Sequence, residues 1–162
     1  MSEQKRENIQ HMNNRNPTLY ITPIAKKDGK YKSNMDYNLQ MANMYNGESA
    51  YWYGPDPIKY KAKVKVNDYL IFWHYSKFVN IHKIINVIEP IYRIHSRTDN
   101  IEHNNRSLIE LSSHFETILW DDYINNYNGY KRCMGTGRVS EKKSKKIVDL
   151  LILIELLILE LQ

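Results

Sequence analysis

Residues 64–75 read Val-Lys-Val-Asn-Asp-Tyr-Leu-Ile-Phe-Trp-His-Tyr, and residues 78–88 read Phe-Val-Asn-Ile-His-Lys-Ile-Ile-Asn-Val-Ile. Alternating, β-branched and aromatic residues interrupted by polar turn residues are typical of consecutive antiparallel strands. The Asn-Asp pair inside the first run marks a turn that leads into the apolar and aromatic residues. The stretch therefore predicts the centre of an antiparallel sheet, with strands near residues 69–75 and 79–88.

The other segments combine strand and helix patterns, so we expect an α+β fold. Further strands are expected at residues 18–24, 59–66, 90–95, 107–111 and 130–134. Helices are expected at residues 35–45, 114–127 and 140–162, the last with Ser140 as its N-cap. Residues 97–105 are expected to form a polar loop, and no internal repeat is visible.

The chain has 162 residues, a length that favours one domain with a substantial core. Residues 1–16 are polar, so we expect a disordered leader before a single domain of residues 17–162. Cys133 is the only cysteine, which excludes an intramolecular disulfide and favours an intracellular protein, cytoplasmic or nuclear. Asn, Ile, Lys and Tyr are abundant, which is typical of AT-rich codons and points to an AT-rich microbe or a large DNA virus as the source.

Basic and aromatic residues occur together in the first half of the chain. From Lys59 to Lys65 every second residue is a lysine, and a period of two places these ammonium groups on one strand face. Such a face is either a solvated edge that discourages aggregation or a track for phosphates. The rings of Tyr51-Trp52-Tyr53, Trp73 and Tyr75 lie near in the sequence, and aromatic faces beside lysines suit base stacking. With a net charge of +5, the pattern favours nucleic acid as the partner.

The run from Lys65 to Ser76, followed by an Ile-rich strand that leads to Pro90, resembles a segment of the PUA-like superfamily, especially its EVE branch. Those domains have a basic or apolar strand, a Gly-Asp turn and a strand reading apolar-apolar-Phe-Tyr-His-Ser. They also have an upstream tryptophan, matched here by Trp52, and the detailed resemblance covers residues 50–90. The resemblance implies a mixed β-barrel flanked by helices that reads RNA, or modified bases in DNA or RNA, through an aromatic pocket.

Two departures separate the chain from the family pattern. Asn67 stands in place of the usual glycine, and asparagine also enters left-handed turns. The Arg-Asn pair that usually follows the tryptophan is absent, and Gly54-Pro55-Asp56 stands there instead. The resemblance carries over Trp52 and the segment Trp73-His74-Tyr75 as the base pocket, to which we add the adjoining Tyr51. A mid-strand tryptophan such as Trp73 is also common in cores, and His74 is equally compatible with a structural role.

Cations for phosphate contacts are expected on two segments of the chain. They are Lys61, Lys63, Lys131, Arg132 and Arg138. The last three surround Gly135-Thr136-Gly137, which is either a simple turn before the closing helix or an anion-binding nest. The spacing does not match a phosphate-binding loop with its Gly-Lys-Ser/Thr ending.

Catalytic motifs are missing from the sequence: there is no His-Glu-x-x-His, no cysteine pair for zinc and no Gly-x-Ser-x-Gly. Pro55-Asp56 and Glu141-x-Lys143 are similar to fragments of a metal-dependent nuclease core. The two fragments are far apart in the sequence, however, and Glu141 is expected to begin a helix. We therefore expect a non-catalytic protein without a metal or another cofactor.

Residues 147–162 are apolar except for the final glutamine and three acids, Asp149, Glu155 and Glu160. The segment is shorter than the roughly 20 residues that span a bilayer, so we expect no membrane partner. At about 100° per residue, Asp149 and Glu160 share a helix face and Glu155 does not, so most of the circumference is apolar. Such a helix packs across the domain or forms the seam of a homodimer through residues 147–161, and contact with a membrane surface is the remaining alternative.

The sequence therefore predicts a nucleic-acid-binding module with an aromatic pocket, and a reader of modified nucleotides is its sharpest form. The alternative is a non-catalytic assembly protein that dimerises through the closing helix. An enzyme acting on RNA would need metal dependence, which no motif indicates.

Overall fold

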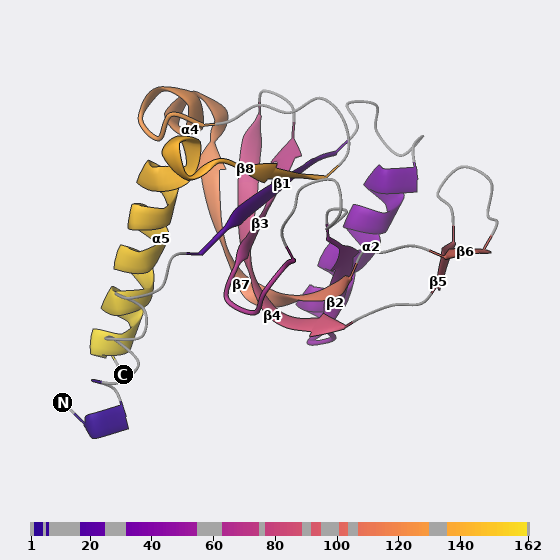
Figure 1. Ribbon diagram of the computed structural model, residues 1–162, viewed down its shortest axis with the longest axis horizontal. Helices are drawn as coiled ribbons and strands as arrows, with labels where there is room; N and C mark the ends of the chain where they lie inside the picture. The colour runs from indigo at the N-terminus through magenta and orange to yellow at the C-terminus, as the bar shows by residue number, and fades with distance from the viewer. Residues whose placement is uncertain are drawn as a thin grey trace.

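The computed structural model describes residues 2–4, 6, 17–24, 32–54, 63–74, 77–88, 92–94, 101–103, 107–129 and 136–161. It is an α+β structure in which a six-stranded mixed sheet has helices on both faces (Figure 1). Helix α5 (Glu141–Leu161) lies against one face and helix α2 (Lys32–Tyr45) against the other. We refer to these two sides as the α5 face and the α2 face.

The strand order across the sheet is β2-β7-β4-β3-β1-β8. The strands are β1 (Leu19–Pro23), β2 (Ala50–Tyr53), β3 (Tyr69–His74), β4 (Phe78–Ile88), β7 (Leu108–Leu119) and β8 (Gly137–Val139). β1 and β3 are parallel, and every other neighbouring pair is antiparallel. The antiparallel pair β3–β4 confirms the two strands that the central stretch predicts. A separate two-stranded sheet holds β5 (Tyr92–Ile94) and β6 (Ile101–His103).

The six-stranded sheet curls into a half-barrel around α2 (Figure 1). The pairing of β4 with β7 shifts register twice, between His82 and Ile84 and between Ile84 and Asn86. Irregularities of this kind bend a strand and increase its twist. Beyond the bend, β4 and β7 continue with β2 beneath α2, so the α2 face is the concave one.

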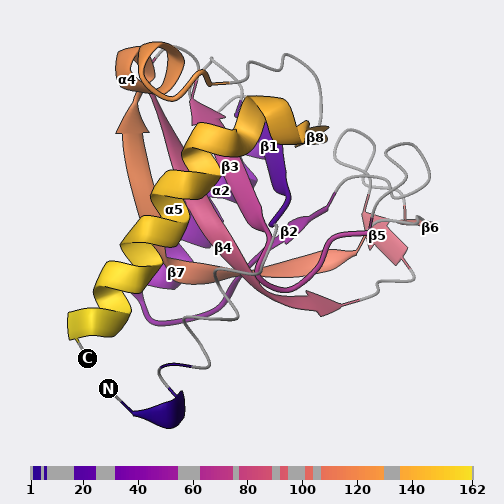
Figure 2. The ribbon, with the colours of Figure 1, turned by 60° about the vertical axis from the view of Figure 1, so that its left-hand side comes forward.

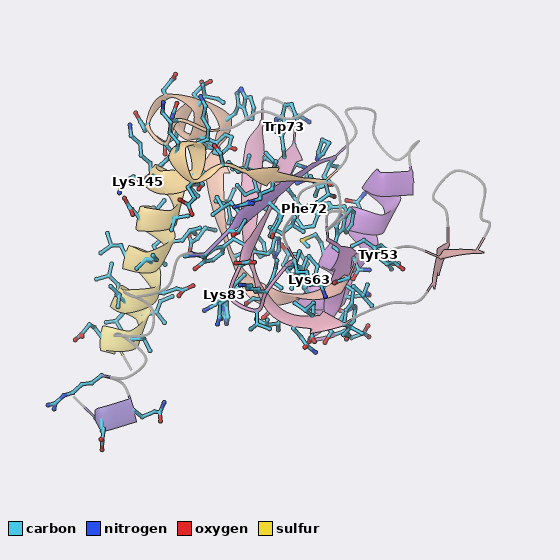
Figure 3. The ribbon with its side chains drawn as sticks, viewed as in Figure 1. Tyr53, Lys63, Phe72, Trp73, Lys83 and Lys145 are labelled. Carbon is cyan, nitrogen blue, oxygen red and sulfur yellow. The ribbon has the colours of Figure 1, made fainter. Side chains whose placement is uncertain are left out.

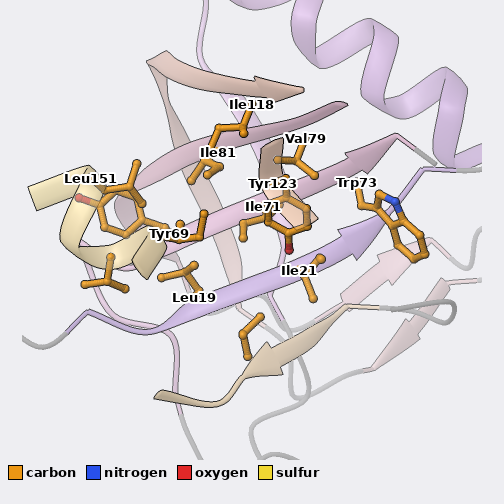
Figure 4. Close-up of a cluster of buried hydrophobic side chains, with 13 residues drawn as sticks. Leu19, Ile21, Tyr69, Ile71, Trp73, Val79, Ile81, Ile118, Tyr123 and Leu151 are labelled. Carbon is orange, nitrogen blue, oxygen red and sulfur yellow. The ribbon is translucent and has the colours of Figure 1, made fainter. Parts of the chain in front are cut away.

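The α5 face is filled with apolar side chains. Its buried residues include Leu19, Ile21, Tyr69, Ile71, Trp73, Val79, Ile81 and Ile118 from the strands, and Ile147, Val148 and Leu151 from α5. Figure 4 shows this cluster, and Figure 2 shows α5 crossing the strands that carry it. Alternate residues of β1 and β3 supply it, as the period of two in a strand requires.

The intervening residues of the same strands point to the α2 face. This second core includes Tyr20, Leu70 and Phe72 from β1 and β3, Ile109 and Leu111 from β7, and Tyr37 and Met44 from α2. Each central strand therefore contributes to two separate cores, which explains why β3 reads as a nearly continuous apolar run.

Asn67 and Asp68 build the turn before β3. Asn67 has φ 78°, in the left-handed region that asparagine tolerates, so the left-handed turn conformation expected at this residue is confirmed. The buried Asp68 carboxylate accepts backbone N–H bonds from Thr18 and Lys65, both at 2.9 Å. The turn is thereby tied to the chain just before β1.

Residues 114–127 do not form the expected helix. β7 continues to Leu119, and only the short helix α4 (Trp120–Asn125) follows. Ile118 lies in the α5-face core, whereas the Phe115 ring stacks on His82 on the α2 face. Strand alternation between two buried faces therefore produced the apolar spacing that resembled a helical stripe.

Other expectations are met in part. Lys63 and Lys65, in the described part of the expected strand 59–66, precede a turn and belong to no strand. β6 occupies part of the expected polar loop, and residues 130–134 lie outside the described residues. α5 begins after Ser140, whose hydroxyl accepts a bond from the Lys143 N–H at 3.4 Å, as expected for an N-cap.

The described part of the polar leader, residues 2–4 and 6, forms one helical turn. Among the described residues, no helix combines the length and the apolar character needed to cross a bilayer.

Candidate nucleic-acid interface

Trp73 lies in the core of the α5 face, with 5% of its surface exposed. Its ring stacks on that of Trp120 from α4, with centroids 5.5 Å apart and planes inclined by 9°. Because Trp120 already covers one face of the ring and core residues surround it, Trp73 has the packing role that its mid-strand position also allowed.

Trp52 lies in β2 on the opposite, α2 face of the sheet. It is half-buried, and its ring meets the edge of Phe72 at a centroid distance of 4.9 Å and an angle of 85°. Phe72 and Trp73 are consecutive residues of β3, so their side chains point to opposite faces. The structure therefore does not bring Trp52 and Trp73 together, and the joint pocket expected from the resemblance does not form.

The other described pocket candidates, Tyr51 and His74, do not share the α5-face core with Trp73. The backbone N–H of Tyr51 donates to Gln40 Oε1 of α2 at 2.8 Å, which ties β2 to the helix. His74 lies on the α2 face, as Trp52 does. Tyr75 lies outside the described residues.

His74 ends β3 and is packed among rings. It stacks on Phe78 with centroids 4.3 Å apart and meets Tyr37 of α2 edge-on at 4.6 Å. Burial, with a smaller contribution from the charge of Lys77, lowers the pKa of His74 from 6.5 to about 4. Its imidazole is therefore neutral at pH 7, and its Nε2 atom has no hydrogen-bond partner among the described residues.

A polar network that the sequence did not predict joins α2, β4 and β7. The Asn80 amide donates to the Tyr37 hydroxyl at 2.6 Å, and the Thr117 hydroxyl donates to Asn80 Oδ1 at 2.8 Å. Asn80 and Tyr37 are buried whereas Thr117 is exposed, so the network runs from the interior to the surface. A buried asparagine inside an apolar strand was the available signal, because buried polar groups require partners.

His82 is fully buried on the α2 face. Its ring stacks on Phe115 at a centroid distance of 4.6 Å and meets the edge of Phe72 at 5.4 Å. Burial lowers the pKa of His82 from 6.5 to about 4; a hydrogen bond to Ser112 opposes this shift and the nearby His74 adds to it. His82 is therefore neutral at pH 7.

Hydrogen bonding fixes the tautomer of His82. Nδ1 lies 3.2 Å from the carbonyl oxygen of Ser112, and a carbonyl oxygen can only accept, so Nδ1 carries the ring proton. Nε2 is then a bare acceptor, buried and without a partner among the residues that the structure describes. An unpaired buried acceptor is costly, and a ligand N–H or O–H group would satisfy it.

The groups around His82 form one patch, which we call the α2-face cluster. It consists of Tyr37, Phe72, His74, Asn80, His82, Phe115 and Thr117. Residues 112–119 of β7 pair with β4 on one side and with no described strand on the other. At that edge Phe115 is half-buried and Thr117 is exposed, so the cluster borders the surface there.

Arg138 is exposed on the edge strand β8, directly opposite Tyr20 of β1. Residues that face each other across an antiparallel pair share a side of the sheet, so Arg138 belongs to the α2 face. The Tyr20 hydroxyl is buried without a partner among the described residues. Burial and, to a smaller extent, the charge of Asp68 raise the pKa of Tyr20 to about 12, against the opposing effect of Arg138.

Lys63 is exposed and lies near the opposite edge of the sheet. Its segment runs against the end of β2: a Cβ on Gly54 would lie 2.9 Å from Val64 Cγ2, so only glycine fits this approach. Figure 3 shows Lys63 and Tyr53 in the same region of the molecule. Lys61, Lys131 and Arg132, the other expected phosphate ligands, lie outside the described residues.

Within the described ranges, no three His, Cys, Asp or Glu side chains come together to hold a metal ion. Glu141 is exposed in the first turn of α5, and Asp56 lies outside the described residues. The chain matches no protein-family model, no curated protein and no solved structure. Function must therefore be inferred from the geometry of the α2-face cluster itself.

Proposed function

We propose that the chain is a non-catalytic, PUA-like nucleic-acid-binding module that holds an unpaired base on its α2 face. The observation that carries the proposal is the bare Nε2 acceptor of His82, buried between the rings of Phe72 and Phe115. Nucleobases present N–H donors at the edges of flat rings. A buried acceptor flanked by aromatic rings suits that chemistry.

Access to His82 is from the β7 edge. Phe115 is half-buried and covers His82 on that side, so rotation of the Phe115 side chain opens the path for a base. Thr117 and Asn80 then lie beside the entrance as further hydrogen-bonding groups. Trp52, half-buried on the same face, is the candidate for stacking a neighbouring base, a contact of about 1–3 kcal/mol.

Two features of the fold support the PUA-like architecture. The half-barrel is a curled mixed sheet with helices on both faces, and its central pair β3–β4 is formed by the residues that carry the resemblance. Recognition of a modified base follows from that resemblance. Aromatic side chains that enclose a base distinguish it from other bases by its shape and by the donors on its edge.

Exposed cations lie near both edges of the α2 face. Arg138 is on β8 and Lys63 is beside β2, and these two strands end the sheet on either side. A strand of nucleic acid crossing the face would meet a cation at each end. Phosphate contacts of this kind release counterions, so we expect affinity to fall steeply with salt.

Fluorescence anisotropy tests the proposal. The probes are labelled single-stranded RNA, single-stranded DNA and duplex DNA, each with and without base modifications, at two salt concentrations. We expect salt-sensitive binding and a preference for one unpaired, modified strand. Absence of binding to every probe at low salt would overturn the proposal.

Variants separate base recognition from phosphate contact. His82→Phe keeps an aromatic ring at this position but removes the acceptor. The variant should therefore bind the preferred probe more weakly and bind the other probes as the parent chain does. Lys63→Gln should weaken the binding of all probes alike. It should also reduce the slope of log affinity against log salt concentration by about one. Lys145→Gln is the matched control, because this exposed lysine lies on α5, away from the α2 face (Figure 3).

A further inference from the structure

We infer that α5 pairs with α5 of a second copy of this chain, antiparallel, around Leu153. The starting observation is an apolar stripe on the outer side of the helix. Leu153, Leu157 and Leu161 recur at intervals of four residues and are 53%, 55% and 88% exposed. Residues four apart lie on one side of a helix, so the three leucines form a single ridge, which we call the outer stripe.

The outer stripe points away from the sheet. Ile147, Val148 and Leu151 form the buried side of α5, and at about 100° per residue Leu153 lies roughly 200° from Leu151. Farther along this buried side, Glu155 Oε1 lies 3.2 Å from Lys83 Nζ and accepts a bond from the Tyr69 hydroxyl. Beyond it the helix extends past the sheet (Figure 1).

This exposure is concentrated in one place. Of the ten large apolar residues that are exposed in the described part of the chain, four belong to the second half of α5. They are Leu153, Leu157, Ile158 and Leu161. Scattered exposed apolar residues need no explanation, but a contiguous ridge of this kind marks an interaction surface.

The charges beside the stripe identify the partner. Lys146 stands seven residues before Leu153 and Glu160 seven residues after it, so all three lie within about 40° of one another around the helix. The outer side of α5 therefore carries Lys146 near its start, Asp149 one turn before Leu153, the leucines of the outer stripe, and Glu160 near its end. An antiparallel copy centred on Leu153 places Lys146 of each chain opposite Glu160 of the other.

Parallel pairing would place Lys146 against Lys146 and Glu160 against Glu160, which like-charge repulsion opposes. The antiparallel arrangement is self-complementary and closes as a two-fold dimer. In it the two Leu153 side chains meet at the axis, and Leu157 lies level with Asp149 of the other copy, whose carboxylate is ion-paired with Lys145 of its own helix at 3.2 Å. The α2 faces of both copies remain outward, because α2 lies on the other side of each sheet.

One helix pair is a smaller contact than the roughly 800 Å² per partner of a standard interface. We therefore expect a reversible dimer whose population rises with protein concentration. Sedimentation velocity on the full chain, from about 1 to 200 μM, measures this equilibrium. A monomer at every concentration would overturn the inference.

Charge reversal tests the orientation without touching the apolar residues. Lys146→Glu alone should raise the dimer dissociation constant at least about tenfold, and Lys146→Glu with Glu160→Lys should restore it. The double variant also places an acid near the N-terminus of α5 and a base near its C-terminus, which favours the helix. A single variant without effect, or a double variant that fails to recover, would contradict the antiparallel register.

The outer stripe is tested separately. Leu153→Glu with Leu157→Glu should give a monomer whose circular dichroism spectrum matches that of the parent chain. Leu39→Glu is the matched control, since Leu39 is 58% exposed on α2, and it should leave the dimer unchanged. Loss of the dimer in the control as well would show that added charge, and not the stripe, is responsible.

Discussion

The two faces of the sheet use the same strands for different purposes. On the α5 face, β3 contributes Tyr69, Ile71 and Trp73 to a core of apolar side chains. On the α2 face, the intervening residues of the same strand meet the buried His82 and Asn80, together with Tyr37 of α2. A strand that alternates between two cores can therefore hold the fold with one side and present chemistry with the other.

The difference lies in how completely the buried groups are satisfied. Apolar packing on the α5 face leaves few hydrogen-bonding groups to pair. The α2 face buries His82 Nε2, His74 Nε2 and the Tyr20 hydroxyl without partners among the described residues, and on the α5 side Glu155 Oε2 is likewise buried and unpaired. Each unpaired buried group destabilises the fold, and the three on the α2 face are the basis of the binding role proposed for that face.

Replacing the two tryptophans should give the largest contrast between the faces. Trp73→Ala should lower the free energy of unfolding by about 3–5 kcal/mol, because it opens a cavity beside Trp120 in the α5-face core. Trp52→Ala should lower it by less, because that ring is half-buried, while weakening selection between bases. Urea denaturation and anisotropy measure the two effects. Equal destabilisation by both variants would remove the distinction between a structural and a binding face.

Acid should destabilise the α2 face selectively. The pKa of His82 is about 4 in the folded chain and 6.5 as the ordinary value, so between these values the unfolded chain binds more protons. Its neutral form supports the fold fully above about pH 6.5, and this contribution is lost as the pH falls towards 4. At pH 5 the expected loss is about 2 kcal/mol from His82.

Denaturation of the parent chain and of His82→Phe at pH 7 and pH 5 checks this expectation. The phenylalanine variant should be less sensitive to pH by that amount, because it cannot take up the proton. Identical pH dependence of the two proteins would mean that His82 is already solvated in the folded state.

Removing the centre of the polar network should have an intermediate effect. Asn80→Leu leaves the Tyr37 and Thr117 hydroxyls without their amide partner, which should cost about 1–3 kcal/mol. Asn86→Leu is a matched control on the exposed part of β4 and should change stability by less than about 0.5 kcal/mol. Thermal denaturation measures the loss of stability in each of the two variants. A control as damaging as Asn80→Leu would attribute the loss to leucine in the strand and not to the network.

The smallest effect is expected for the ion pair under α5. Glu155→Gln weakens the contact with Lys83, a partly exposed pair, so a loss of about 1 kcal/mol or less is expected. Binding to nucleic acid should not change, since Glu155 lies on the α5 side. Urea denaturation measures the loss; a value near that of Trp73→Ala would mean that charge, and not apolar packing, holds α5 in place.

Local patterns in the sequence predicted local structure. The turn at Asn67 and the strands β3 and β4 follow from residues adjacent in the chain, and their pairing needs only a short connection. The expected helix at residues 114–127 is wrong, because the strand β7 continues to Leu119. Alternation between two buried faces leaves apolar residues at spacings that also fit a helix. Only tertiary contacts distinguish a strand from a helix at these residues, and the pairing of β7 with β4 provides those contacts.

The site was less predictable than the fold. The sequence is compatible with Trp73 in a core or in a pocket. The stacked ring of Trp120, which is distant in sequence, is the contact that identifies it as a core residue. His82 gave no signal of its own in an isoleucine-rich strand, because the Ser112 carbonyl that fixes its tautomer lies on another strand. Strand alternation predicts that neighbours face opposite sides, but not which side will contain unpaired polar groups.

The central claim is that an unpaired base donates a hydrogen bond to His82 Nε2. Nitrogen-15 NMR of the histidine side chains, during titration with the single-stranded probe that binds best, observes this atom directly. We predict that the free protein has a protonated Nδ1 and a bare Nε2, and that only the Nε2 resonance of His82 moves strongly when the probe binds. Saturated binding with an unchanged His82 Nε2 resonance would contradict the claim and place the nucleic acid elsewhere.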